Sequence, residues 1–350
     1  MIQLSAFLLA LLAAHQLTPV VRSLMWRVNV VDNPNPANPG KIHRHPTPLG
    51  GGIAIFAATV GAMLVTGAID AELGILLGAA AAMLALGFVD DTRVLDWKPR
   101  IFVQALASLV FILVTGASIP GIASIWVAVP LMVFWLVGVT NALNLMDNID
   151  GATSGVAFMA GTLLFLIEPT SSAGILGLVV AGACCGFLRY NSRPASIFLG
   201  DTGTLFLGFT LGALALLQAR HLDGSFAQLS VLPMIFGVPI FDTTLATFLR
   251  LRRHRPIYLP DKSNLTYRLQ ELGMTDREVV MFEYLLASLM GVCALATLRM
   301  TGPMAFLPPL AALSAMLAMG VRLGSVPYPE DLPLATRPRP APPRSTRTAA

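Results

Sequence analysis

The feature that most constrains this chain is the recurrence of apolar segments long enough to cross a lipid bilayer. A membrane-spanning helix needs about 20 mostly apolar residues. Only 12% of the 350 residues are charged, against roughly 25% in soluble proteins. The sequence therefore predicts an all-α, polytopic integral membrane helical bundle with ten or eleven transmembrane helices, of which we expect the sixth and seventh to be the shortest. The apolar segments lie near residues 2–21, 50–69, 73–89, 101–118, 122–140, 153–167, 172–188, 204–219, 229–249, 280–298 and 303–321.

The positions of the basic residues predict how these helices are oriented. If the first helix is uncleaved and begins outside, every Lys and Arg except Arg220 and Arg299 falls in an inner loop or in the C-terminal segment. Inner loops of membrane proteins are enriched in Lys and Arg, so this distribution indicates orientation and contact with anionic lipid headgroups, not nucleic-acid binding. We expect an integral membrane domain over residues 1–325 and a disordered, Pro- and Arg-rich cytoplasmic tail over residues 326–350. The three cysteines lie within apolar segments and indicate neither disulfides nor a zinc site.

The densest group of polar residues follows the fifth apolar segment, on the predicted inner side. Asn141, Asn144 and Asp147 are spaced three residues apart, and Asp150 comes next. On a helix this spacing keeps the side chains close to one face. Amide and carboxylate oxygens on such a face suit a divalent cation or the hydroxyl and imide groups of a nucleotide. A polar loop that merely caps a helix is the alternative interpretation.

Two further acidic motifs are predicted on the inner side. Asp90 and Asp91 end the third apolar segment, where they repel each other and face the negative end of the helix dipole. Such a pair calls for a compensating cation, either a metal ion or Lys98 and Arg100. Asp201 lies in a Gly-Asp-Thr-Gly turn at the start of the eighth segment, where a carboxylate and free backbone N–H groups converge. An ordinary helix cap again explains Asp201 equally well.

Basic residues are predicted next to these acidic motifs. Lys41 and His43 precede three consecutive glycines, Gly50 to Gly52, and could meet phosphate; a positive flank followed by tight helix packing is the alternative. The loop over residues 250–277 is strongly basic. Within it, leucines at helical spacing predict a short amphipathic helix on the membrane surface that could close over an anionic substrate.

Together these motifs predict a cytoplasmic active-site cleft. Carboxylates flanked by Lys and Arg, without His or Cys ligands, suit Mg²⁺ or Mn²⁺ and phosphate chemistry. A multi-span transporter is an alternative, because intramembrane carboxylates often line ion paths. A transporter predicts acidic residues through the middle of the bilayer, whereas here they cluster at one edge.

The motifs also resemble those of the polyprenyl-phosphate N-acetylhexosamine-1-phosphate transferase superfamily, in the same order between about residues 40 and 275. The resemblance implies a magnesium- or manganese-dependent membrane enzyme. Such an enzyme transfers a sugar-1-phosphate from a UDP-sugar, such as UDP-N-acetylglucosamine, to a polyprenyl phosphate, such as undecaprenyl phosphate. The products are the polyprenyl-diphosphate-sugar and UMP, in the first membrane step of a cell-envelope polysaccharide pathway. Whether the chain forms a homodimer stays open.

The resemblance also implies roles for individual residues. Asp90 and Asp91 would be catalytic, with Asp90 orienting or deprotonating the lipid phosphate, and Asp201, Asn144 and Asp91 would hold or adjoin the metal ion. The implied substrate-binding residues are Lys41, His43, Lys98, Asn141, Asp147, Asp150, Asn264 and Arg268.

The chain departs from the superfamily pattern in its last basic loop. Members that transfer N-acetylglucosamine phosphate usually carry a His-rich run there, and Asn264 and Tyr267 take two of the His places. The His-His-Glu pattern of the muramoyl-pentapeptide enzymes is also missing, which favours a smaller UDP-sugar. These departures leave the identity of the sugar open, and they motivate a second alternative, a catalytically weakened relative.

Overall fold

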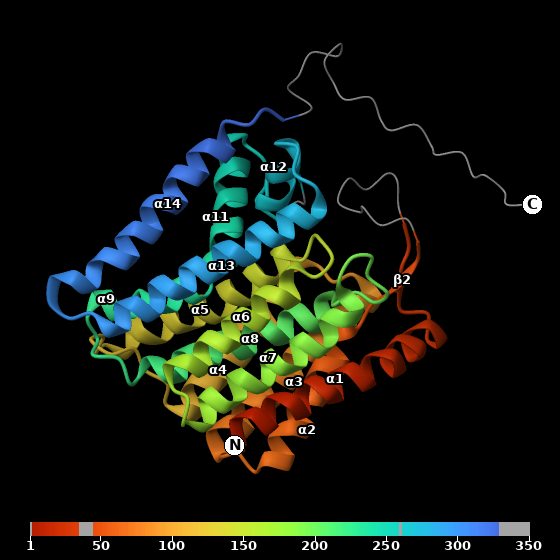
Figure 1. Ribbon diagram of the computed structural model, residues 1–350, viewed down its shortest axis with the longest axis horizontal. Coiled ribbons are helices and arrows are strands. Elements are labelled where there is room, and N and C mark those ends of the chain that lie inside the picture. Colours follow the sequence, from red (N-terminus) through yellow and green to blue (C-terminus); the bar gives the residue numbers. More distant parts are fainter. Residues whose placement is uncertain (1, 35–44, 259–260, 329–350) are drawn as a thin grey trace, which may run out of the picture.

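The computed structural model describes residues 2–34, 45–258 and 261–328, and all eleven predicted apolar segments are helical in it (Figure 1). A short antiparallel pair, β1 (Val31–Asp32) and β2 (Thr47–Pro48), follows the first helix. The helices are α1 (Ile2–Arg27), α2 (Gly51–Thr66), α3 (Ala71–Arg93), α4 (Trp97–Thr115), α5 (Ile125–Met146), α6 (Ala152–Ile167), α7 (Ser172–Asn191), α8 (Gly200–Ala219), α9 (Phe226–Leu229), α10 (Val231–Ile235), α11 (Gly237–Arg252), α12 (Leu265–Glu271), α13 (Asp276–Arg299), the 3-10 helix η1 (Gly302–Phe306) and α14 (Leu307–Gly324).

The helix lengths confirm a multi-pass membrane bundle. Within the described ranges, eight helices are long and apolar enough to cross a membrane, and the segment from α9 to α11, which is bent by 81°, makes a ninth if it is counted as one span. The remaining two apolar helices, α2 and α6, have only 16 residues each. The prediction that the seventh segment is among the shortest is wrong, because α7 has 20 residues; the second segment is short instead.

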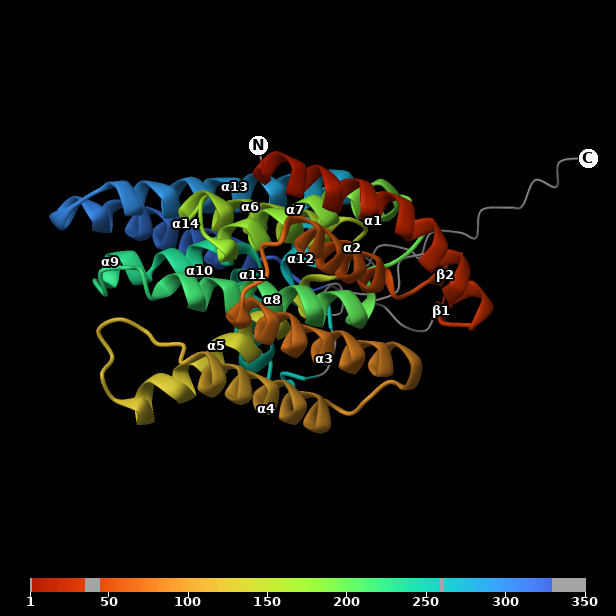
Figure 2. The ribbon, with the colours of Figure 1, turned by 90° about the horizontal axis from the view of Figure 1, so that it is seen from below.

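Helix α8 is the centre of the bundle. Every residue of α8 is buried except Asp201, in its first turn. It packs against α3 and α5 on one side and against α2, α6 and α7 on the other, as Figure 2 shows. An apolar helix that is enclosed all round is typical of a bundle core. Asp201, the one side chain of α8 that is not buried, is therefore held on a rigid frame.

Two glycines let the backbones of neighbouring helices touch the first turn of α8. A Cβ atom on Gly52 of α2 would lie 2.3 Å from the Cα atom of Gly203, and one on Gly87 of α3 would lie 2.2 Å from the carbonyl oxygen of Asp201. Small residues at such contacts are the usual means of close helix packing in membranes. They bring the ends of α2, α3 and α8 to one place.

Different contacts between loops and helix ends hold the two ends of the bundle together. At the end that holds the acidic motifs, Trp97 stacks on Tyr258 with ring centroids 5.8 Å apart, and Arg193 forms an ion pair with Asp276. These contacts join three loops that were predicted to share the inner side. At the opposite end, Arg220 donates to both carboxylate oxygens of Glu72 at 2.7 Å.

The last basic loop is held differently from the expectation. Helix α12 forms where predicted, but Leu265 and Leu269 pack into the core and Leu272 is exposed. Thr266 to Arg268 are buried as well, so α12 is enclosed by protein and does not lie on a membrane surface. Asp242 of α11 accepts a hydrogen bond from the backbone N–H of Leu265 and so joins α11 to α12. The bend before α11 turns that helix across the others, toward α12 (Figure 1).

Candidate active site

A polar cleft of about 380 Å³ opens where α3 and α5 end and α8 begins. Its volume lies in the range of roughly 300–1,000 Å³ that is common for small-molecule sites. Six of the residues predicted from the sequence line it together, although they come from three separate motifs. The lining residues are Asp32, Leu49, Asp90, Asp91, Val94, Asn144, Asp147, Asn148, Ile149, Asp150, Asn191, Phe198, Leu199, Gly200 and Asp201.

Asp91 is bound to the start of α8. One of its carboxylate oxygens accepts the backbone N–H of Asp201 at 2.9 Å. The other accepts the backbone N–H of Thr202 at 3.0 Å and its hydroxyl at 2.5 Å. The first N–H groups of a helix have no partner within the helix, so a carboxylate from α3 supplies the cap of α8. Gly200, at φ +72°, leaves the space that this contact needs, because a Cβ atom there would lie 2.6 Å from Asp91.

Asp90 is the more deeply buried member of the pair, and both of its oxygens are also engaged. Oδ1 accepts the backbone N–H of Leu95 at 2.6 Å, and Oδ2 accepts Nη1 of Arg100 at 3.0 Å. The same guanidinium nitrogen lies 3.9 Å from the carboxylate of Asp201. Of the two compensating cations predicted for the Asp pair, the structure places Arg100 there, between two carboxylates of the cleft.

Asn144 and Asp201 are direct neighbours. The amide nitrogen of Asn144 donates to Asp201 and also, at 2.8 Å, to the hydroxyl of Thr204. Both residues line the cleft, where the chain offers the carboxylate of Asp201 beside the amide of Asn144. Within the described part of the chain, no three His, Cys, Asp or Glu side chains are grouped as metal ligands.

Asp147 and Asp150 also line the cleft, from the turn between α5 and α6. Burial raises the pKa of Asp147 to about 7, and the nearby carboxylates of Asp91 and Asp150 act in the same direction. Asp150 accepts the backbone N–H of Ala195 at 3.0 Å, which ties this turn to the loop after α7. Carboxylates from three separate segments thus line the cleft.

Comparison with known proteins supplies an independent line of evidence. The model of "Glycosyl transferase family 4" matches residues 73–219, the range that contains Asp90, Asp91, Asp147, Asp150 and Asp201. A probable undecaprenyl-phosphate N-acetylglucosaminyl 1-phosphate transferase of Bacillus subtilis is 34% identical over 304 residues, which cover 83% of each chain. The chain belongs to glycosyl transferase family 4. More distant relatives of this family 4 protein have the same kind of activity in their names.

The Mycobacterium tuberculosis decaprenyl-phosphate N-acetylglucosaminephosphotransferase is 28% identical over 318 residues, covering 79% of this chain and 78% of the relative. A phospho-N-acetylmuramoyl-pentapeptide-transferase of Gemmatimonas aurantiaca is also 28% identical, over 364 residues, covering 85% and 93%. Family 4 relatives of both kinds, those named for N-acetylglucosamine and those named for muramoyl-pentapeptide, thus cover most of the chain.

Two predicted substrate-binding residues lie outside the cleft lining of this family 4 protein. Asn141 donates to the side chain of Gln104 and to the carbonyl of Val137 at 2.8 Å, and so fastens α5 to α4. Lys98 is exposed at the start of α4, 5.7 Å from the ring of Trp97. Lys41 and His43 lie outside the described residues, so their predicted roles stay predictions.

The other two predicted substrate-binding residues, Asn264 and Arg268, lie at the start of α12 and within it. Arg268 is fully buried and donates to the carbonyls of Leu323, at 3.2 and 3.1 Å, and Val326. Asn264 caps α12 by accepting the N–H of Tyr267 at 3.1 Å. Neither side chain lines the cleft in this structure, and their predicted contacts with substrate stay predictions.

The same region also fixes the first residues of the predicted tail. The ring of Tyr328 lies 4.2 Å from the guanidinium of Arg268, and its hydroxyl lies 2.9 Å from that of Ser263. Tyr328 is only 8% exposed, so the packed part of the chain runs past the predicted boundary at residue 325. Residues 329–350 lie outside the described part.

Nine residues of the cleft lining were not among the predicted site residues. Of these, Asp32 reaches the cleft from β1, Asn191 from the end of α7, and Phe198 from the loop before α8. Phe198 could have been found, because it stands two residues before the Gly-Asp-Thr-Gly turn. Asp32 has no such signal, since it stands in a Pro- and Asn-rich stretch of which only the pairing of β1 with β2 reveals the position.

Proposed function

We propose that this family 4 protein transfers a sugar-1-phosphate of the N-acetylhexosamine type from a UDP-sugar to a polyprenyl phosphate. An oxygen of the lipid phosphate attacks the β-phosphorus of the UDP-sugar, the bond between the two phosphates of the donor breaks, and UMP leaves. The observation that carries this proposal is the convergence of Asp90, Asp91, Asn144 and Asp201 on one cleft at the first turn of α8. Arg100 is bound to Asp90 there and lies 3.9 Å from Asp201. The active site would face the cytoplasm, since the basic loops lie at the same end.

The residues of the cleft fit a magnesium ion. Mg²⁺ commonly takes one or two carboxylates and completes its shell with water and substrate phosphates. Asp201 and the amide oxygen of Asn144 would hold it, and the ion would neutralise charge on the pyrophosphate of the donor. Asp91 suits a supporting role better than direct ligation, because its oxygens already accept three hydrogen bonds from α8.

Arg100 and Asp90 would act on the acceptor. A phosphate monoester has a second pKa of about 6, so the lipid phosphate is largely dianionic at neutral pH and needs little help from a base. Asp90 holds the guanidinium of Arg100 at 3.0 Å, and the guanidinium would orient the incoming phosphate. Asp147 and Asp150, which also line the cleft, would accept hydrogen bonds from the nucleotide.

The test is release of UMP by the purified protein from a panel of UDP-sugars, with added polyprenyl phosphate and Mg²⁺. We expect release with at least one UDP-N-acetylhexosamine, loss of release after chelation of the metal, and loss in Asp201→Ala. Asp223→Ala, which removes an exposed carboxylate at the other end of the bundle, is the matched control and should retain full activity. Normal turnover in a folded Asp201→Ala variant would contradict the proposed metal site, and no release with any UDP-sugar would contradict the function.

A further inference from the structure

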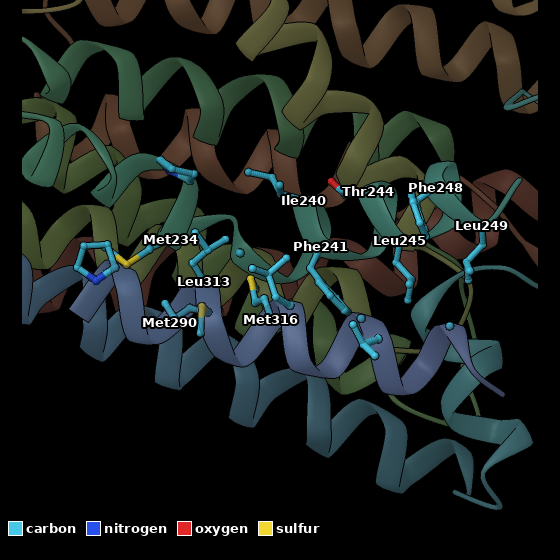
Figure 3. Close-up of a pocket in the computed structure, with 18 of the residues that line it drawn as sticks. Met234, Ile240, Phe241, Thr244, Leu245, Phe248, Leu249, Met290, Leu313 and Met316 are labelled. Atoms are coloured by element: carbon cyan, nitrogen blue, oxygen red, sulfur yellow. The ribbon is translucent and has the colours of Figure 1, made fainter. Parts of the chain in front are cut away.

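A second and much larger cavity lies apart from the acidic cleft, between α11, α13 and α14. Its volume is about 1380 Å³, beyond the roughly 1,000 Å³ that marks the upper end for small-molecule sites. Figure 3 shows Phe241 and Leu245 of α11 opposite Leu313 and Met316 of α14, with Met290 of α13 below them. No described residue lines both this apolar groove and the acidic cleft.

The groove exists because α14 stands away from the rest of the bundle. Only Pro308, Ala312 and Leu323 of α14 are buried, and the helix approaches α11 at its glycines: a Cβ atom on Gly320 would lie 3.6 Å from Phe241. A space of this size cannot stay empty, because an apolar void forfeits the packing of every residue around it. Inside a bilayer, the molecules at hand to fill an open apolar groove are lipids.

The charges of the groove select among lipids. Its charged lining residues are Arg252 and Arg253, both at the C-terminal end of α11, and Thr244 is a single polar group midway along. The guanidinium of Arg253 also lies 3.7 Å from the ring of Tyr328. A long apolar groove with two cations at one end is complementary to an amphiphile with apolar chains and an anionic head. Methionines along the wall, such as Met234, Met290 and Met316, adapt to chains of irregular shape.

We propose that this groove binds an anionic phospholipid of the inner leaflet, with its acyl chains between α11 and α14 and its phosphate at Arg252 and Arg253. The polyprenyl acceptor is a poorer occupant, because Arg100 and the carboxylates of the cleft do not line the groove, so a phosphate held there is not the one that reacts. This site goes beyond the proposed transfer reaction and does not depend on it.

Native mass spectrometry of the full chain in detergent tests the proposal, with phosphatidylglycerol and phosphatidylcholine of identical acyl chains as probes. We expect one phosphatidylglycerol to be retained at least ten-fold more tightly than phosphatidylcholine. Arg252→Gln, at an exposed side chain, should reduce that preference, and the double variant with Arg253→Gln should abolish it. Arg277→Gln removes an exposed charge that does not line the groove and should leave the preference unchanged.

A second pair of variants tests the apolar part. Leu313→Trp fills the groove and should weaken retention of both lipids, whereas Leu289→Trp, on the exposed face of α13, should not. Equal retention of the two lipids by all variants, as expected of adventitious lipid, would overturn the proposal. So would one-for-one displacement of phosphatidylglycerol by polyprenyl phosphate, which would assign the groove to the acceptor. The measurement uses no UDP-sugar, so its outcome is independent of the transfer assay.

Discussion

Substitution of Asp91 by Ala tests whether this carboxylate mainly supports α8 or mainly serves the chemistry. The structure gives it three hydrogen bonds from Asp201 and Thr202. Loss of a helix cap costs about 1–2 kcal/mol, and a hydroxyl deprived of a charged acceptor adds about 1–2 kcal/mol. We therefore expect Asp91→Ala to lower the free energy of unfolding by about 3 kcal/mol.

The assay is denaturant unfolding in detergent micelles followed by circular dichroism, with UMP release measured on the same preparations. Asp91→Asn keeps one acceptor oxygen and should recover part of the loss. The matched control is Asp96→Ala, because Asp96 caps α4 through an exposed contact with the N–H of Trp97; it should cost less than about 1 kcal/mol. If Asp91→Ala unfolds like the native chain but no longer releases UMP, Asp91 acts on metal or substrate and the capping argument is wrong.

Three further predictions concern helix packing, pH and the C-terminal contact. Gly87→Ala should abolish UMP release and lower the unfolding midpoint, because its Cβ would lie 2.2 Å from the carbonyl oxygen of Asp201. The control Gly78→Ala, on the same helix, meets nothing within 4 Å and should be neutral. Equal behaviour of the two variants would refute the close contact. The pKa of Asp147 is raised to about 7, so the ionised fraction of its carboxyl group, the form that only accepts hydrogen bonds, increases as pH rises from about 6 to about 8. UDP binding measured by calorimetry should therefore strengthen over that range. Asp147→Asn should remove the pH dependence. Tyr328→Ala should destabilise the fold by about 2 kcal/mol in thermal unfolding, because the contacts of its ring with two guanidinium groups are lost. Tyr328→Phe keeps the ring and should cost less. Equal losses of stability in the two variants would assign the effect to the hydroxyl.

The helices could be predicted because the bilayer leaves the chain little choice. Backbone groups in hydrocarbon must pair within the segment, so each apolar run becomes a helix, and the position of Lys and Arg orders the loops. That reasoning also brings Asp90, Asn144, Asp147 and Asp201 to one end of the bundle, and the structure places all four on one cleft.

Contacts between distant segments could not be predicted in the same way. The cap that Asp91 provides for α8 joins residues 110 positions apart, and a pair of adjacent carboxylates gives no local sign of it. Hydropathy reports that residues 229–249 are apolar but not that the span bends by 81°. Because α12 packs beside the bent helix, the surroundings of Arg268 and Asn264 depend on that bend. They could therefore not be predicted from the sequence.

The two 16-residue helices have a consequence for the membrane itself. At 1.5 Å per residue, α2 and α6 are each about 24 Å long, while the hydrocarbon layer is about 30 Å thick. Both begin beside the cleft, at Gly51 and Ala152. Where these ends meet lipid, we expect the bilayer to thin or water to enter above them. Headgroups of neighbouring lipids would then sink toward Asp90 and Asp201, and membrane thickness would become a control on turnover.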